Sequence, residues 1–168
     1  MSLKRIFVLL CTAIITVAAV AKTPINTEIF AAINDSNSEF YYPNLMMRYK
    51  AGEPLTDEQY HYLYYGYAYQ AAYRPLNDNP GMTKVQNIMA RIAIDTPSVV
   101  DIDQLIAACS EAMELDPFSP KLLNIMAYAY GTAGDTAREK IYSDHLAAIL
   151  RTIATSGTGA KEREPMHI

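Results

Sequence analysis

The chain has 168 residues, of which 51% are hydrophobic and 19% charged, and its formal net charge is −4. This length suits one domain of ordinary size, and the composition excludes disorder as the default state because enough apolar surface is available for a packed core. The negative charge makes the chain a poor ligand for nucleic acid or for an anionic membrane surface.

The N-terminus has the pattern of a signal peptide. Lys4 and Arg5 form a positive start, residues 6–20 are an uncharged apolar run, and an Ala-x-Ala cleavage motif ends at Ala21. We predict that residues 1–21 are removed, that the mature protein is exported to the periplasm or the extracellular space, and that no membrane span remains after cleavage. Loss of the two cations leaves 12 basic and 18 acidic residues, so the mature net charge is −6.

The two cysteines bear on lipid attachment and on disulfides. Cys11 lies in the apolar run, but Leu10 before it is larger than lipoprotein processing favours, so lipid attachment is disfavoured. Cys109 remains alone after cleavage, which excludes an internal disulfide. Its helical face is otherwise apolar, so we predict a buried thiol rather than a reactive one or one paired between molecules. That face also carries Leu105, Ala108 and Ala112.

Two short helices are predicted at the start of the mature chain. The first begins at Thr23 and ends before the polar break at residues 34–38. The second spans Pro43 to Lys50, because proline suits the first helical position. Gly52 follows as a left-handed cap.

The stretch from Leu55 to Pro75 reads as one helix rich in tyrosine. Thr56 and Gln59 have the spacing of a capping box at its start, and Pro75 forbids continuation. Gly66 costs helix propensity, so we expect it to permit a close contact with another helix. More than half of the 13 tyrosines of the chain lie in this stretch: Tyr60, Tyr62, Tyr64, Tyr65, Tyr67, Tyr69 and Tyr73.

At about 100° per residue these tyrosines fall on two faces of the predicted helix. We expect the first face to be structural, and it comprises Tyr60, Leu63, Tyr64 and Tyr67. We expect the second face to be exposed, tolerant of replacement by alanine and available to a ligand, and it comprises Tyr62, Tyr65, Tyr69 and Tyr73. The alternative is that every tyrosine fills the core.

The second half predicts four more helices after a strong break at residues 74–81. They span Thr83–Ile94, Asp101–Leu115 with a capping box formed by Asp101 and Gln104, Ser119–Ala133 with Ser119 as cap, and Thr136–Thr155. Strand signals are scarce until the last residues, so the predicted class is all-α. The connections are short, which favours antiparallel helical hairpins.

Residues 103–142 resemble a tetratricopeptide repeat, whose period is about 34 residues. The resemblance rests on L-D-P at 115–117 and on the Gly134-Asp135 turn, together with Leu123, Ala127 and Tyr130. The small residue expected in the following helix is displaced, and Glu139 stands in its place. We therefore predict a helical repeat-like domain over residues 22–159, with a plain helical bundle as the alternative.

A second resemblance covers most of the mature chain. It rests on F-Y-Y-P-N-L-M-M-R-Y at 40–49, L-T-D-E-Q-Y-H-Y-L-Y-Y-G-Y-A-Y-Q at 55–70 and D-P-F-S-P-K-L-L-N-I-M-A-Y-A-Y at 116–130. These motifs resemble domain-of-unknown-function family 4919, a family of small exported bacterial proteins. The resemblance implies a mostly helical, exported protein and carries no catalytic residues. It also implies a C-terminal strand region, so residues 160–168 are expected to be a tail that begins such a strand in a truncated member.

The sequence shows no pattern of catalytic or metal-binding residues. His61, His145 and His167 stand in no metal-ligand spacing, and the neighbours of His145 in Ser143-Asp144-His145 point about 100° apart on a helix, which prevents a triad. The glycine-rich residues 156–161 follow a helix and suit a cap better than a phosphate loop. We therefore expect no enzyme activity, no metal and no cofactor.

The function that we predict is binding of a protein or peptide partner in a tyrosine-rich groove between helices. Tyr62, Tyr65, Tyr69, Tyr73, Tyr128 and Tyr130 are the candidate binding residues. The alternatives are a carbohydrate-handling protein or enzyme that uses the same tyrosines, and a purely structural scaffold. The partner and the oligomeric state stay open at this point.

Overall fold

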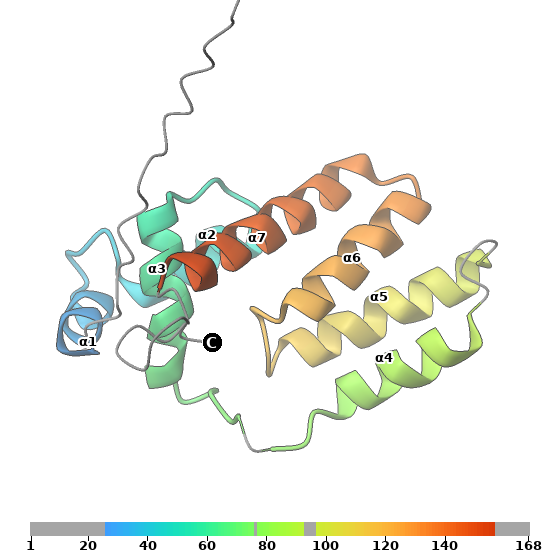
Figure 1. Cartoon of the computed structure of the whole chain (residues 1–168), viewed down its shortest axis with the longest axis horizontal. Helices are drawn as coiled ribbons and strands as arrows, with labels where there is room; N and C mark the ends of the chain where they lie inside the picture. The colour runs from blue at the N-terminus through green and yellow to red at the C-terminus, as the bar shows by residue number, and fades with distance from the viewer. Residues whose placement is uncertain (1–25, 76, 93–96, 157–168) are drawn as a thin grey trace, which may run out of the picture.

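The computed structural model describes residues 26–75, 77–92 and 97–156, and within these ranges it contains seven α-helices, one short 3-10 helix and no strand (Figure 1). The predicted all-α class is confirmed for this part of the chain. No helix in these ranges is long and apolar enough to cross a membrane. The predicted signal peptide, the predicted helix start at Thr23 and the tail at 160–168 lie outside the described residues.

The helices form two groups that α7 joins. Their bounds are α1 (Asn26–Asn34), α2 (Tyr42–Lys50), α3 (Asp57–Gly66), the 3-10 helix η1 (Tyr67–Tyr69), α4 (Pro80–Arg91), α5 (Val99–Met113), α6 (Pro120–Thr132) and α7 (Thr136–Thr155). From α4 to α7 each helix packs against the next one in the chain, and α3 packs against α1, α2 and α7. Figure 1 shows α7 lying beside α6 and extending across to α3.

Several predicted helix ends are confirmed by local contacts. The Thr56 hydroxyl accepts the Gln59 N–H, and the Gln59 side chain accepts the Thr56 N–H, which completes the capping box. Gly52 has a φ of +71°, the left-handed conformation expected after α2. The bounds of α7 agree with the predicted Thr136–Thr155.

The predicted start of α4 was wrong because the capping residue was assigned to a loop. The helix begins at Pro80, three residues before the predicted Thr83. The Asn79 side chain accepts the Met82 N–H at 3.1 Å, and its amide donates to the Ala112 carbonyl at 2.9 Å. Asn79 therefore caps α4 and ties its first turn to the end of α5.

The predicted cap of α5 was also wrong. The helix begins at Val99, and Ser98 is its cap because the Ser98 hydroxyl oxygen accepts the Asp101 N–H at 3.1 Å. Gln104 does not reach back to Asp101; its amide oxygen accepts a hydrogen bond from Arg91 on α4. A capping residue three positions before the predicted one therefore begins the helix.

The tyrosine helix ends well before the predicted Pro75. The Gln70 side chain donates to the Gly66 carbonyl at 3.2 Å, while the Gln70 N–H donates to the Tyr67 carbonyl at 2.9 Å. The side chain thus replaces the backbone donor that a continuing α-helix would bring to Gly66. The chain becomes extended at Gln70, so the residues that follow leave the helical faces predicted for them.

Two apolar clusters make up the core. The first joins α1, α2, α3 and α7 through fully buried side chains such as Ile33, Leu45, Leu63 and Ile149. The second joins α4, α5 and α6 through Val85, Leu105, Met126 and Cys109, which confirms that the thiol is buried. Tyr142 on α7 packs against both clusters.

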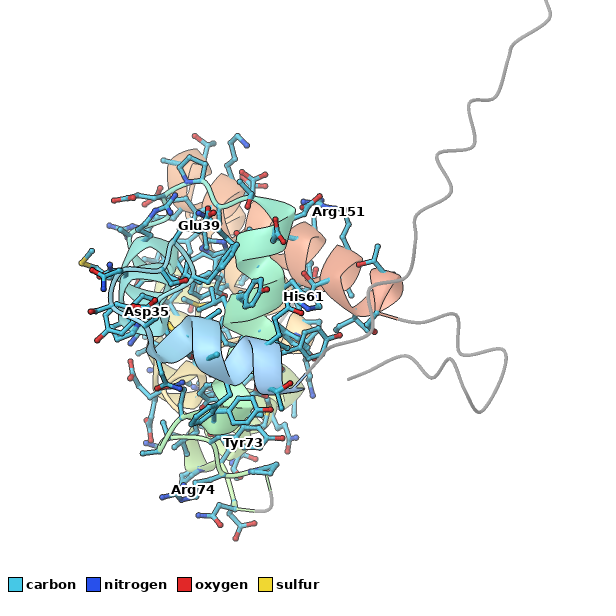
Figure 2. All side chains as sticks on the ribbon, turned by 90° about the vertical axis from the view of Figure 1, so that its left-hand side faces the viewer. Asp35, Glu39, His61, Tyr73, Arg74 and Arg151 are labelled. Carbon is cyan, nitrogen blue, oxygen red and sulfur yellow. The ribbon has the colours of Figure 1, made fainter. Side chains whose placement is uncertain are left out.

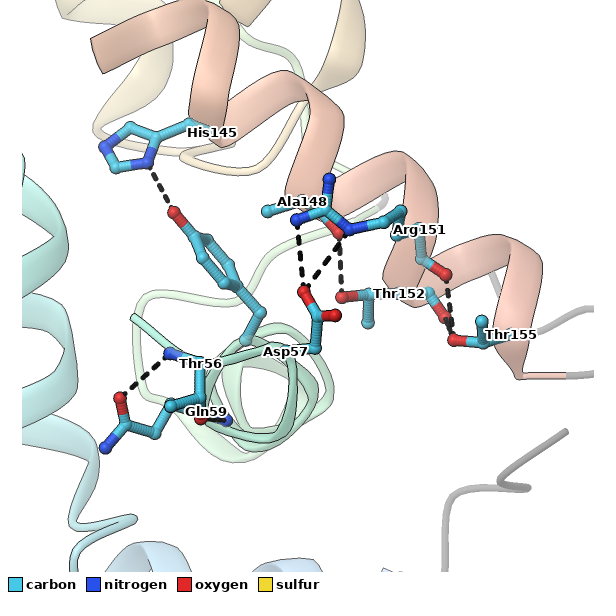
Figure 3. Close-up of polar contacts among 9 residues, drawn as sticks. Thr56, Asp57, Gln59, His145, Ala148, Arg151, Thr152 and Thr155 are labelled. Carbon is cyan, nitrogen blue, oxygen red and sulfur yellow. Dashed lines mark hydrogen bonds and ion pairs between the residues drawn. The ribbon is translucent and has the colours of Figure 1, made fainter. Parts of the chain in front are cut away.

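A buried histidine on α7 links three helices. The Tyr60 hydroxyl lies 2.7 Å from His145 Nδ1 (Figure 3). His145 Nε2 lies 3.1 Å from the Tyr49 carbonyl oxygen. A carbonyl only accepts, so Nε2 carries the proton and Nδ1 accepts from Tyr60. Burial lowers the pKa of His145, which keeps the imidazole neutral and this arrangement stable.

The contact extends through Tyr49 to the turn between α5 and α6. The Tyr49 ring stacks on the imidazole with centroids 4.0 Å apart, and its hydroxyl donates to the Pro117 carbonyl at 2.9 Å. Figure 3 also shows the exposed ion pair between Asp57 and Arg151, 3.1 Å apart. An exposed ion pair of this kind contributes little to stability. The buried hydrogen bond between His145 and Tyr60 is therefore the contact that fixes α7 against α3.

Acid should destabilise the protein through His145. Because its pKa is lowered in the folded state, the unfolded chain takes up the proton more readily, and the free energy of unfolding falls as the pH falls through the ordinary value of 6.5. Urea unfolding at about pH 7.5 and about pH 5.5 measures this loss. His145→Gln should lose less stability over that interval; an equal loss in both proteins would contradict the assignment.

The contact between α4 and α5 leaves no room for a side chain at Gly81. A Cβ there would lie 2.6 Å from Ala112 Cα, whereas a Cβ at Gly131 would meet the flexible carboxylate end of Glu139. Gly81→Ala should therefore lower the free energy of unfolding by about 1–3 kcal/mol or more. Gly131→Ala is the matched control and should change it by about 1 kcal/mol at most, measured by urea unfolding.

Candidate functional site

A cavity of about 530 Å³ lies between the end of α3, the connection from α3 to α4, and the turn between α5 and α6. We call it the tyrosine cavity, because five aromatic side chains line it and four of them are tyrosines. These are Tyr64, Tyr65, Tyr67, Tyr73 and Phe118. Its volume lies within the range of about 300–1,000 Å³ that is usual for ligand pockets.

The rings of the tyrosine cavity stand nearly perpendicular to one another. Tyr67 and Phe118 meet at 83° with centroids 5.6 Å apart, and Tyr67 and Tyr73 meet at 80° and 5.5 Å. Tyr64 and Phe118 meet at 61° and 6.0 Å. Edge-to-face pairs of this kind are favourable, so the walls hold one another in place.

Hydrogen bonds fix the innermost tyrosine. The Tyr67 hydroxyl donates to the Leu115 carbonyl at 2.9 Å and lies 3.4 Å from the Ala72 carbonyl, which joins the end of α5 to the connection after η1. Tyr64 is half-buried, and its enclosure raises the pKa of its hydroxyl to about 12. Both phenols are therefore neutral at ordinary pH and available as walls or hydrogen-bonding groups.

Two charged side chains lie at the tyrosine cavity. Enclosure by its neighbours raises the pKa of Asp116, and a hydrogen bond from Ser119 opposes that rise. Arg74 lies exposed at the rim and donates to the Tyr73 carbonyl at 3.0 Å. Among the described residues no ion pair joins either of these charges to another side chain.

Tyr62 was expected on the open face, and that expectation was wrong. Its side chain is only 4% exposed. Its hydroxyl donates to Glu28 Oε1 at 2.6 Å, and its ring stacks on Phe40 with centroids 4.0 Å apart. The reason is that α1 packs across this face of α3, as Figure 2 shows, with His61 above α1 and Tyr73 below it.

The other three tyrosines of the predicted face have separate positions. Tyr65 is half-buried at the tyrosine cavity and is hydrogen-bonded to Ser156 at the end of α7. Tyr69 is 39% exposed and lies edge-on to the exposed Phe30 of α1. Tyr73 is also 39% exposed and lines the tyrosine cavity. Only Tyr65 and Tyr73 therefore belong to the same site.

Tyr128 and Tyr130 lie on α6 and do not line the tyrosine cavity. Tyr128 borders a shallow hollow with Gly131. Tyr130 stacks on Tyr142 with centroids 5.5 Å apart, and the Arg138 guanidinium lies 5.2 Å from its ring centre. The six predicted binding residues therefore do not share one groove.

The site also contains residues that the sequence analysis did not assign to it. Tyr64 and Tyr67 were placed on the structural face, and they carry both roles, since they are packed and line the tyrosine cavity. Asp116 and Phe118 come from the short segment between two predicted helices, to which no binding role was assigned. The signal was present in the predicted break at 74–81 and in the proline-containing connection at 116–120, both of which line the cavity.

Other groups of reactive residues have structural partners. His145 contacts Tyr60 and Tyr49, and Asp144 pairs with Lys140 at 2.7 Å, so Ser143-Asp144-His145 forms no triad. Within the part of the chain that the structure describes, no group of three His, Cys, Asp or Glu residues could hold a metal ion. The chemistry of the site is therefore that of an aromatic cavity lined by one exposed carboxylate and one exposed guanidinium.

Fold and site together define an all-helical protein with an aromatic cavity at the junction of its two helical groups. A family described as "Domain of unknown function (DUF4919)" matches residues 27–168, and the chain belongs to this family. The family resemblance seen in the sequence is thereby confirmed. No curated protein and no solved structure matches the chain.

Burial separates two tyrosines that the helical pattern placed on one face. Tyr62→Ala should lower the free energy of unfolding by about 3–5 kcal/mol, because it empties a packed site and leaves Glu28 without its partner. Tyr73→Ala should cost about 1 kcal/mol, the loss of one edge-to-face contact. Urea unfolding measures the free energy of unfolding of both variants, provided that its dependence on urea concentration is unchanged. Equal losses in the two variants would contradict the different burial of the two side chains.

Proposed function

We propose that this protein is an exported module of tetratricopeptide-like antiparallel hairpins that binds an extended peptide segment of a partner protein in the tyrosine cavity. The observation that carries the proposal is the cavity itself, about 530 Å³ with walls of tyrosine and phenylalanine. Tyrosine suits such a role because its ring gives a large contact area with few rotatable bonds. The absence of a catalytic pattern in the sequence agrees with binding rather than catalysis.

The apolar surface continues outside the tyrosine cavity, which supports an extended ligand. Leu115 lines the cavity and is partly exposed. Phe30 and Tyr69 form an exposed edge-to-face pair at the end of the same tyrosine-rich segment. A peptide could place one side chain in the cavity and lay its neighbours on this surface, since recognition of peptides combines one or two anchors with flanking contacts.

A carbohydrate is the competing ligand. It is the weaker choice because polar side chains of the cavity already form hydrogen bonds within the protein. The Asn79 side chain already accepts a hydrogen bond from the Met82 N–H and donates one to the Ala112 carbonyl, and the Tyr67 hydroxyl already donates to the Leu115 carbonyl. A sugar ring presents hydroxyl groups on every side, and these two side chains are already engaged in hydrogen bonds. A peptide side chain that anchors in the cavity presents fewer hydrogen-bonding groups.

Peptide selection on the purified protein tests the proposal. Peptides from a random library are selected on the immobilised protein, labelled and titrated against three proteins: wild type, Tyr73→Leu and Tyr128→Leu. Tyr73→Leu should weaken binding by about tenfold, because hot-spot aromatic residues contribute about 1–2 kcal/mol or more, whereas Tyr128→Leu lies on α6 away from the cavity and should leave binding unchanged.

Other outcomes of this experiment identify the alternatives. Equal weakening by both substitutions would remove the tyrosine cavity as the site. Failure to select any peptide, with Tyr73-dependent binding of oligosaccharides, would favour the carbohydrate-handling protein. Failure of both ligand classes would favour a structural scaffold.

A further inference from the structure

Asp116 is an exposed carboxylate that lines the tyrosine cavity and has no cation paired with it among the described residues. It lies between Leu115 and Phe118 on the turn from α5 to α6, and Ser119 is its hydrogen-bond partner. A ligand that covers this carboxylate removes water from it, and a positive charge on that ligand would offset the loss.

The negative potential of Asp116 reaches the walls of the tyrosine cavity. Asp116 lines the tyrosine cavity together with Tyr64 and Tyr67, and its charge is one of the causes that raise the pKa of both phenols. The aromatic faces add to that potential, because the face of a ring is negative and its edge positive. Near-perpendicular rings turn their faces in different directions, so Tyr67, Tyr73 and Phe118 form adjacent walls rather than a flat stack.

The protein's own nearest candidate counter-ion is held elsewhere. Arg74 lies exposed at the rim, and its guanidinium donates to the Tyr73 carbonyl. It forms no ion pair with Asp116, and it is not among the groups that shift the pKa of that carboxyl. The space beside Asp116 therefore stays open to a cation that the ligand brings.

We infer that the tyrosine cavity selects a cationic side chain, the ammonium of lysine or the guanidinium of arginine, held against the partly exposed ring of Tyr73 and the carboxylate of Asp116. This inference rests on the proposed peptide-binding function and names the residue that the peptide inserts. An acidic side chain would meet the potential of Asp116 and of the ring faces. A neutral side chain would cover the exposed carboxylate of Asp116 without supplying a counter-charge.

Two small probes of similar shape test the charge directly. Tetramethylammonium chloride carries the positive charge, and tert-butanol is its neutral counterpart. The chain has no tryptophan, so tyrosine emission follows the titration together with tyrosine ring signals in NMR spectra. Tetramethylammonium should bind about tenfold or more tightly than tert-butanol, since a cation over aromatic faces with a nearby carboxylate gains on this order. Equal affinities, or preferential binding of acetate, would overturn the inference.

Matched variants separate the contributions that the Tyr73 ring, the Tyr73 hydroxyl and the Asp116 charge make to binding. Tyr73→Leu and Asp116→Asn should each remove most of the preference for tetramethylammonium, while Tyr73→Phe should keep it because the ring face is retained. Arg74→Gln should leave the preference unchanged or raise it. If Tyr73→Phe loses as much as Tyr73→Leu, the hydroxyl rather than the ring binds the ligand, and the inference is wrong.

The peptides from the selection distinguish failure of this inference from failure of the proposed function. A bound peptide should lose about tenfold or more in affinity when its lysine or arginine is replaced by norleucine, an uncharged side chain of similar length. Tyr73-dependent binding that is insensitive to this replacement would leave the peptide-binding function standing and overturn the cation selectivity. Selective binding of tetramethylammonium without any peptide binding would support the cation site and overturn the peptide ligand.

Discussion

The neutral imidazole of His145 is the contact on which the arrangement of the helices depends. It accepts from Tyr60 on α3, donates to the Tyr49 carbonyl on α2 and stacks on the Tyr49 ring. Tyr49 in turn donates to the Pro117 carbonyl between α5 and α6. Each polar atom of this buried chain has one partner of the right kind, so a shift of any one helix would leave a polar group without a bond.

The same contact determines where the tyrosine cavity forms. Fixing Pro117 against Tyr49 places the next residue, Phe118, against Tyr64 and Tyr67 at the end of α3. The hydroxyl of Tyr67 then holds the Leu115 carbonyl from the other side. The segment from Leu115 to Phe118 is therefore both a joint between the two helical groups and one wall of the cavity, which links the stability of the fold to the shape of the site.

The early end of the tyrosine helix gives the site its enclosed form. If the helix continued to Pro75, its tyrosines would form long parallel stripes. Because the Gln70 side chain bonds the Gly66 carbonyl, the chain turns away after η1 and brings Tyr73 back against Tyr67. The result is a compact aromatic cavity with one exposed carboxylate in its lining, in place of an open groove along a helix.

The sequence by itself determined the all-α class, the capping box at Thr56, the cap at Gly52 and the extent of α7, because these depend on residues within about four positions of one another. Only the tertiary structure decided which tyrosines are open. Periodicity shows that a helix has two apolar faces, but not that α1 covers Tyr62. Likewise the cavity joins Tyr67 to Leu115, 48 positions apart, and no local pattern encodes such a contact.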